Sequence, residues 1–336
     1  MIKHIEIAPV FRRRFFLVMT LVGLVCVVYS WAVLSTVVRI EREAILTNQM
    51  ELTRSITARI DSYLERNYQA LQLMALGSSL SNSSASQASL QQYSLLSGAW
   101  DTLVLTDLQG TVISSDRPFV SDQHTVTSDT QVQSLLVQVQ QGQSAYSDFF
   151  HSKLTGKPTI VFAVPVHDES GTGIRGALIG FLSWPQISSY LEGIERAQGA
   201  IIDSHNQVIA YHLPGNALNT STFSIGDTIS PVYMQSLRDN TQVSKTILSS
   251  QALFGKRGYL TALHETGYSN YRGNNWIIVF ERPLQGIFGA GNIQIISATL
   301  IFMAVLFLLL PFLVFCRGAL YRIQRRMGSK PANIRP

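Results

Sequence analysis

Two uncharged apolar runs lie near the ends of the chain and enclose almost all of it. The first is Phe15–Val38, which has 24 residues, and the second covers roughly Gly286–Cys316. Each run is long enough to cross a hydrocarbon layer of ~30 Å as a helix. The pattern therefore predicts two transmembrane helices, at residues 15–38 and 292–316, with a large segment, residues 39–285, between them on one side of the membrane.

The basic residues beside these runs predict the orientation of the chain. The flanks 1–14 and 317–336 together contain ten Lys and Arg residues and one acid, Glu6. Because basic flanks stay on the cytoplasmic side, both ends are predicted to be cytoplasmic. The segment 39–285 has 16 Lys and Arg against 20 Asp and Glu, a formal charge of −4. The basic balance of the chain thus indicates topology and no nucleic acid partner.

The tail 317–336 is predicted to be a short basic cytoplasmic segment. Its six basic residues are expected to lie against anionic lipid head groups, and a docking patch for a protein partner is the alternative. A cleaved signal peptide is the alternative for the first run. However, 24 uncharged residues exceed the usual apolar region of a signal peptide, and no small-x-small cleavage site occurs around Trp31–Val38. The first run is therefore expected to stay as an anchor.

The two cysteines, Cys26 and Cys316, lie in or beside the predicted membrane helices. The segment 39–285 consequently has no disulfide and no thiolate metal site. With 247 residues it is long enough to bury a substantial core and to form more than one unit. Its stability is expected to come from that core.

Residues 39–80 are predicted to form a long helix that continues out of the first membrane helix. This stretch contains no proline and no glycine before Gly77. Its apolar positions recur at helical spacing, at Ile45, Leu52, Ile56, Ile60, Tyr63, Leu64, Leu71 and Met74. This apolar stripe is expected to pack either on the rest of the same chain or on a second copy of it. Formation of a homodimer is therefore one of two alternatives. The Ser-, Asn- and Gln-rich segment Gly77–Gln92 is predicted to be a break.

Short strands follow, and their pattern occurs twice. The segments Leu103–Ser115 and Ala200–Tyr211 each alternate apolar and polar residues on both sides of a short turn, which predicts two hairpins. Asp107 aligns with Asp203, and Gly110 with Asn206. The later segments Pro158–Trp184 and Gly258–Arg282 each predict two longer strands around a glycine-rich turn. One module is therefore predicted twice, at 95–190 and 195–285.

Several segments resemble the double Cache sensor domain of bacterial transmembrane receptors. They read TDLQGTVISS, YSDFFHSKLTGKPTIVFAVPV and DESGTGIRGALIGFLSW, and the most specific piece is SDFF-x-x-x-LTGKP before a strand that ends in AVPV. The resemblance covers 39–285 and is stronger in the first module. It implies an α+β fold in which a long N-terminal helix carries two PAS-like antiparallel-sheet modules, flanked by two transmembrane helices. It also implies a periplasmic sensor domain on a bacterial inner membrane.

The family usually binds its small ligand in the membrane-distal module, here 95–190. Tyr146 and Asp148 are two residues apart on a probable strand, so they are expected to share a face, where a phenol and a carboxylate suit a small cation or an amine. The resemblance implies that this Tyr-x-Asp element contacts a ligand amine. The alternative is a structural hydrogen bond at a strand end. Further candidates for the same pocket are Trp100, Arg117 and His151.

Two other elements of the amino-acid-binding pattern are absent. The preceding helix, Ser128–Gln140, carries no Arg followed by aromatic residues, and Phe181 lies where a later Asp is expected. The ligand class therefore stays open among amines, carboxylates and purines.

No motif for catalysis, a metal or a cofactor stands out. Gly171, Gly173 and Gly176 spell G-x-G-x-x-G, but they lead into a predicted strand, whereas a dinucleotide loop opens a helix. His264-Glu265 has no second histidine four residues on, and the other histidines show no ligand spacing. We expect no enzyme, no metal and no cofactor.

The expected function is a membrane-anchored extracytoplasmic sensor. It binds a small molecule in the distal Cache module and signals through its transmembrane helices to a separate, unidentified partner. One alternative is a ligand-free adaptor that keeps the Cache fold and offers a protein surface. Another is the sensory half of a truncated chemoreceptor, histidine kinase or diguanylate cyclase, because such receptors continue into an output domain and this chain ends at Pro336.

Overall fold

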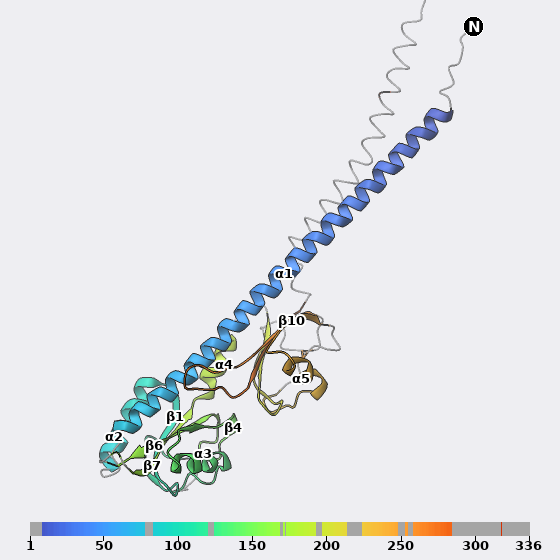
Figure 1. Cartoon of the computed structure of the whole chain (residues 1–336). Coiled ribbons are helices and arrows are strands. Elements are labelled where there is room, and N and C mark those ends of the chain that lie inside the picture. Colours follow the sequence, from blue (N-terminus) through green and yellow to red (C-terminus); the bar gives the residue numbers. More distant parts are fainter. Residues whose placement is uncertain are drawn as a thin grey trace, which may run out of the picture. The chain divides into compact units, whose positions relative to one another are not determined.

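The structure is a computed structural model, and Figure 1 shows its helices and strands. The contacts within the chain divide it into two units. One unit is Met1–Ala44 with Gln285–Pro336, and the other is Ile45–Leu284. The residues that the structure describes are 9–77, 83–119, 124–168, 171, 173–192, 197–213, 224–247, 253–254, 258–283 and 317. The predicted membrane helix at 292–316 and almost all of the predicted tail lie outside these residues.

The first element is the helix α1, Pro9–Gly77. It contains residues 39–77 of the predicted long helix 39–80 and ends at the glycine where the break was expected, while residues 78–80 lie outside the described residues. Among the described residues, no helix is found with the length and hydropathy that crossing a bilayer requires. The predicted membrane helix at 15–38 lies within α1, and half of its side chains are outside the described set. It stays a prediction.

The predicted break at Gly77–Gln92 is wrong over its second half. Residues Ser83–Ser97 form a helix, α2. Serines and glutamines dominate this helix and give little apolar periodicity, and among its residues of described burial only Leu90 and Ser94 are buried. The helix lies against β1 and β2 of the first sheet, so tertiary packing stabilises a segment of weak intrinsic helix propensity.

The first module is an antiparallel sheet with strand order β2-β1-β7-β6-β3. Its strands are β1 (Trp100–Asp107), β2 (Val112–Ser115), β3 (Ala145–Tyr146), β6 (Val161–His167) and β7 (Ile174–Leu182). The helix α3, Thr130–Gln140, covers one face. The strands β4 (Phe150–His151) and β5 (Pro158–Thr159) pair with each other beside it. The helix α4, Trp184–Glu192, leads to the second module.

The second module repeats this arrangement. Its sheet has the order β10-β11-β12-β8-β9, which read backwards matches the first sheet strand for strand. Its strands are β8 (Gln198–Ile202), β9 (Val208–His212), β10 (Gln242–Ile247), β11 (Gly258–His264) and β12 (Ile277–Pro283). The helix α5, Pro231–Arg238, takes the place of α3. For the described residues, the α+β class with a long helix and two antiparallel sheets is confirmed.

The two predicted hairpin turns have the same construction. The Asp107 side chain accepts hydrogen bonds from the N–H groups two and four residues later, at 2.9 and 2.7 Å, and Asp203 does the same at 2.9 and 2.7 Å. Gly110 and Asn206 take the left-handed backbone, with φ of 84° and 66°. The aligned positions of the two modules therefore carry the same local structure.

Each sheet has two apolar faces, and α1 covers one face of both. On the outer faces α3 and α5 close separate cores. On the inner faces a single core joins α1 to both sheets. From α1 it contains Ile56, Ile60, Tyr63, Leu64, Tyr68, Leu71 and Ala75. The predicted stripe is thus confirmed in its central part, while Leu52 is 39% exposed. The module bounds 95–190 and 195–285 stay predictions.

A substitution at Gly176 on β7 would test how closely the strands of the first sheet are packed. A Cβ on Gly176 would lie 2.1 Å from the backbone oxygen of Thr106 on the neighbouring strand. We expect Gly176→Ala to lower the free energy of unfolding by about 1–3 kcal/mol, because the backbone must move apart. The control is Gly77→Ala at the end of α1, where no atom lies within 4 Å. Denaturant unfolding that gives equal stabilities for the two variants would contradict this packing.

Candidate functional site

The Tyr146 side chain lies where the first module meets the second. It is placed by β3, in which Tyr146 pairs with Phe162 of β6. Its hydroxyl donates to the Gly273 carbonyl at 3.3 Å and accepts from the Arg272 N–H at 3.2 Å. Its ring packs on Tyr271, with centroids 4.8 Å apart. All three of these partners belong to the loop between β11 and β12.

Asp148 contacts the same neighbouring module. Its Oδ1 accepts a hydrogen bond from the Trp276 indole N–H at 2.7 Å, and its Oδ2 accepts one from the Ser204 hydroxyl at 2.7 Å. Between them, the Ser147 carbonyl accepts from the Asn274 amide at 3.3 Å. All three residues of the Tyr-x-Asp element therefore form hydrogen bonds with the second module. Strand β3 ends at Tyr146, so Asp148 lies beyond the strand on which it was predicted.

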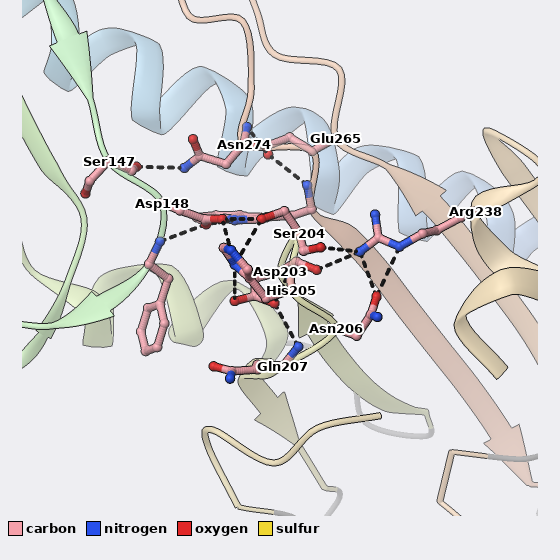
Figure 2. A network of polar contacts seen from close by, with 12 residues as sticks. Ser147, Asp148, Asp203, Ser204, His205, Asn206, Gln207, Arg238, Glu265 and Asn274 are labelled. Carbon is pink, nitrogen blue, oxygen red and sulfur yellow. Dashed lines mark hydrogen bonds and ion pairs between the residues drawn. The ribbon is translucent and has the colours of Figure 1, made fainter. Parts of the chain in front are cut away.

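Three potential metal ligands converge at this junction (Figure 2). The ligand atoms of Asp148, Asp203 and His205 lie within 4.8 Å of one another. The Nδ1 atom of His205 is 3.8 Å from Asp148 and 3.7 Å from Asp203. Two carboxylates and an imidazole are a ligand set that a divalent transition metal can use. Each of these carboxylates, however, already accepts two or more protein hydrogen bonds.

The Asp203 carboxylate is 2% exposed. Burial is the main reason why its pKa is raised; the hydrogen bond from the Gln207 N–H opposes this, and the negative charge of Asp148 adds to it. Arg238 lies on the far side of the same turn (Figure 2) and donates to the Asn206 side chain and to the carbonyls of Asp203 and Ser204. The guanidinium thereby fixes the turn from α5.

A second polar cluster joins α1 to the loop between β11 and β12. On α1, Glu65 accepts the N–H groups of Asn270 and Tyr271 at 3.3 and 2.8 Å. One helical turn earlier, Asp61 is in hydrogen-bond contact with Glu265, which directly follows β11. The three carboxyl groups are 3–5% exposed, so α1 holds this loop through buried acids.

The Glu265 carboxyl accepts further hydrogen bonds from its own loop. The donors are the Tyr271 hydroxyl at 2.8 Å and the Asn274 N–H at 2.7 Å. Burial and then the charge of Asp61 nonetheless raise the pKa of Glu265 to about 8. Burial likewise raises the pKa of Asp61 to about 6, although its hydrogen bond to Glu265 opposes the shift.

The other three predicted site residues lie apart from this junction. Trp100 is 2% exposed and packs on Phe162 at 6.2 Å, and its indole N–H has no partner among the described residues. Arg117 forms an ion pair with Asp116 at 3.5 Å. His151 is exposed on β4. The structure brings Tyr146 and Asp148 together, and Trp100 shares only their sheet face.

The space between the first sheet and α3 is filled by apolar side chains. Phe181, which lies roughly where the resemblance led us to expect an Asp, is fully buried there. The buried members are Val104, Val126, Val132, Leu135, Leu136, Val139, Ala145, Leu154, Val161, Ala163, Ala177, Ile179 and Phe181. Their apolar character favours packing over polar recognition of a ligand.

Sequence reasoning missed the partners in the second module. Ser204, His205 and Trp276 meet Asp148 from turns 56 to 128 residues away along the chain. The alignment of the two predicted hairpins does identify Asp203, but only as a turn residue and not as a neighbour of Asp148. Asp61 was missed because a helix stripe is identified by its apolar positions, and Glu265 because its partner lies on α1, far away along the chain.

The G-x-G-x-x-G motif forms a turn between strands, as predicted. Gly171 has φ of 72°, and its N–H donates to the Asp168 carbonyl at 2.9 Å. The strand β7 begins at Ile174, directly after Gly173. His264 contacts the Leu237 carbonyl through its Nε2 atom at 3.1 Å.

Comparisons with known proteins agree with this architecture. A family model described as the Cache domain, in its double form, matches residues 38–290. No curated protein matches the sequence. The ligand-binding domain of the Pseudomonas fluorescens chemoreceptor CtaA, solved with L-isoleucine, has a TM-score of 0.54 at 15% identity, covering 74% of this chain and 97% of its own.

Two further sensor domains have a similar fold. The ligand-binding domain of the Pseudomonas aeruginosa PAO1 amino acid chemoreceptor PctB, solved with L-Gln, has a TM-score of 0.51 at 13% identity, covering 74% of this chain and 97% of its own. The Vibrio cholerae histidine kinase DctB sensor domain has a TM-score of 0.51 at 14% identity, covering 72% and 98%. Together with the family match, they identify the fold. This chain belongs to the Cache domain family, in the double Cache form found in sensor domains of chemoreceptors and histidine kinases.

Proposed function

We propose that the protein is a membrane-anchored extracytoplasmic sensor that binds a small molecule in its distal module and signals to a separate partner through its transmembrane helices. The observation that carries this proposal is the single core that joins α1 to both sheets. A conformational change in either sheet would therefore act directly on the same face of α1. In this proposal α1 is the output element, and the sensor domain lies in the periplasm of a bacterial inner membrane.

The ligand class that fits Tyr146 and Asp148 best is an amine. A bound ammonium group would compete for Asp148 with the Trp276 indole and the Ser204 hydroxyl, which now occupy both oxygens. Binding would then be coupled to the contact between the modules. Such a ligand shifts the equilibrium only by its difference in affinity for the two arrangements.

The second candidate is a ligand-free adaptor that presents a protein surface. It is favoured by the apolar filling between the first sheet and α3. In this case the polar junction at Asp148 serves only to fix the two modules to each other. The two proposals differ in whether any small molecule stabilises the fold.

A thermal-shift screen of the full chain in detergent separates these candidates. The panel contains amino acids, polyamines, carboxylates and purines. A ligand at 100 times its dissociation constant adds ~2.7 kcal/mol to the free energy of unfolding. We expect an amine to raise the melting temperature, and Asp148→Asn to abolish that rise.

The matched control for this screen is Asp239→Asn, which changes an exposed aspartate at the end of α5. A response that persists in Asp148→Asn would place the ligand elsewhere. If no compound in the panel stabilises the folded chain, the adaptor is the better proposal.

The hydroxyl of Tyr146 gives a second test, of the module junction itself. We expect Tyr146→Phe to destabilise the protein by about 1 kcal/mol, because it leaves the Arg272 N–H and the Gly273 carbonyl without their partner. Amide exchange at Arg272 should become faster. Tyr211→Phe, at a tyrosine that is 37% exposed on β9, is the control. Unchanged exchange at Arg272 would show that this bond does not hold the loop.

A further inference from the structure

Two buried carboxyl groups from separate elements face each other where α1 meets the second module. Asp61 lies on α1 and is 5% exposed, and Glu265 follows β11 and is 4% exposed. They are in hydrogen-bond contact, and the Oδ1 atom of Asp61 has no hydrogen-bond partner among the described residues. Two carboxylates in such contact repel each other, so the contact requires a shared proton.

Other titratable or charged groups surround this pair. The facing titratable or charged groups are Glu65 on α1, Tyr271 and Arg272 on the loop, and Tyr146 on β3. Glu65 brings a third buried carboxyl group to the same loop. Arg272 interacts electrostatically with Tyr146 and donates its backbone N–H to that hydroxyl. Complete ionisation would thus leave several carboxylates between the helix and the loop.

We propose that Asp61 and Glu265 form a pH-dependent contact, which holds α1 against the second module while the pair shares a proton and loosens it once both groups are ionised. The proton then acts as a ligand of the contact between the helix and the loop. This inference goes beyond the proposed sensing of a small molecule and does not depend on it.

The direction of the effect follows from the pKa values. Both are raised in the folded protein, to about 6 and about 8, whereas the unfolded chain has ordinary carboxyl pKa values of about 4. Between about pH 4 and about pH 8 the folded state therefore binds more protons than the unfolded state. The stability that the pair contributes is complete at low pH and falls as the pH rises through this window.

The first test is the melting temperature of the full chain in detergent from about pH 5.5 to about pH 8.5. We expect a fall of several °C in the unmodified chain and a much smaller fall in Glu265→Gln, which keeps the shape of the side chain but cannot ionise. Asp61→Asn should have the same effect from the helix side. Glu51→Gln, an exposed glutamate on the same helix, should keep the original pH dependence.

A local measurement separates this contact from other titrating groups. Amide exchange of residues 56–71, corrected for the intrinsic effect of pH, should rise with pH in the unmodified chain and stay flat in Glu265→Gln. Glu281 is also buried but binds Tyr233 and the N–H groups of residues 253–254 on the α5 side. Glu281→Gln should therefore leave the rise in residues 56–71 unchanged.

Two results would overturn the inference. One is a pH-dependent rise in exchange of residues 56–71 that persists in both Glu265→Gln and Asp61→Asn. The other is the absence of any such rise in the unmodified chain. If one of the two variants does not fold, the other decides, because each removes one half of the same carboxyl pair.

Discussion

The buried face of α1 is the constraint on which the rest of the structure depends. In each module one helix, α3 or α5, covers the outer face of the sheet. The inner faces are apolar as well. Helix α1 packs against both of them, and α2 and α4 add Leu90, Trp184, Ile187 and Leu191 to the same core. Complete burial of one large aliphatic side chain contributes about 1.5–3 kcal/mol, and Ile60, Leu64 and Leu71 are all fully buried here. Without α1, the inner face of each sheet would be exposed to water.

Polar contacts then define how the two modules meet. An apolar core tolerates small sliding movements, but a carboxylate with two short hydrogen bonds from fixed donors does not. Asp148 provides such a point for Trp276 and Ser204, and Glu65 provides another for the loop at Tyr271. Removing one partner leaves a buried polar group unpaired, which costs more than the bond itself contributes. These contacts therefore select one arrangement of the modules along the helix.

The two modules share one topology but differ in what their outer cores contain. In the first, the space under α3 is filled by apolar side chains, including Phe181. In the second, Glu281 is buried under α5 and accepts bonds from Tyr233 and two backbone N–H groups. A shared strand order consequently does not imply a shared interior. Function has to be argued from the side chains at each site.

The sequence by itself determined the features that depend on near neighbours along the chain. These include the period of the α1 stripe, the alternation of the strands and the two turns that begin at Asp107 and Asp203, whose hydrogen bonds span four residues or fewer. It failed at α2, where serines and glutamines give no apolar signal. The tertiary structure alone decided which side chains meet across the modules. Asp148 and Trp276 are 128 residues apart, and Asp61 and Glu265 are further apart still. Polar pairs of this kind leave no periodic pattern, because each depends on one contact that only the folded chain creates.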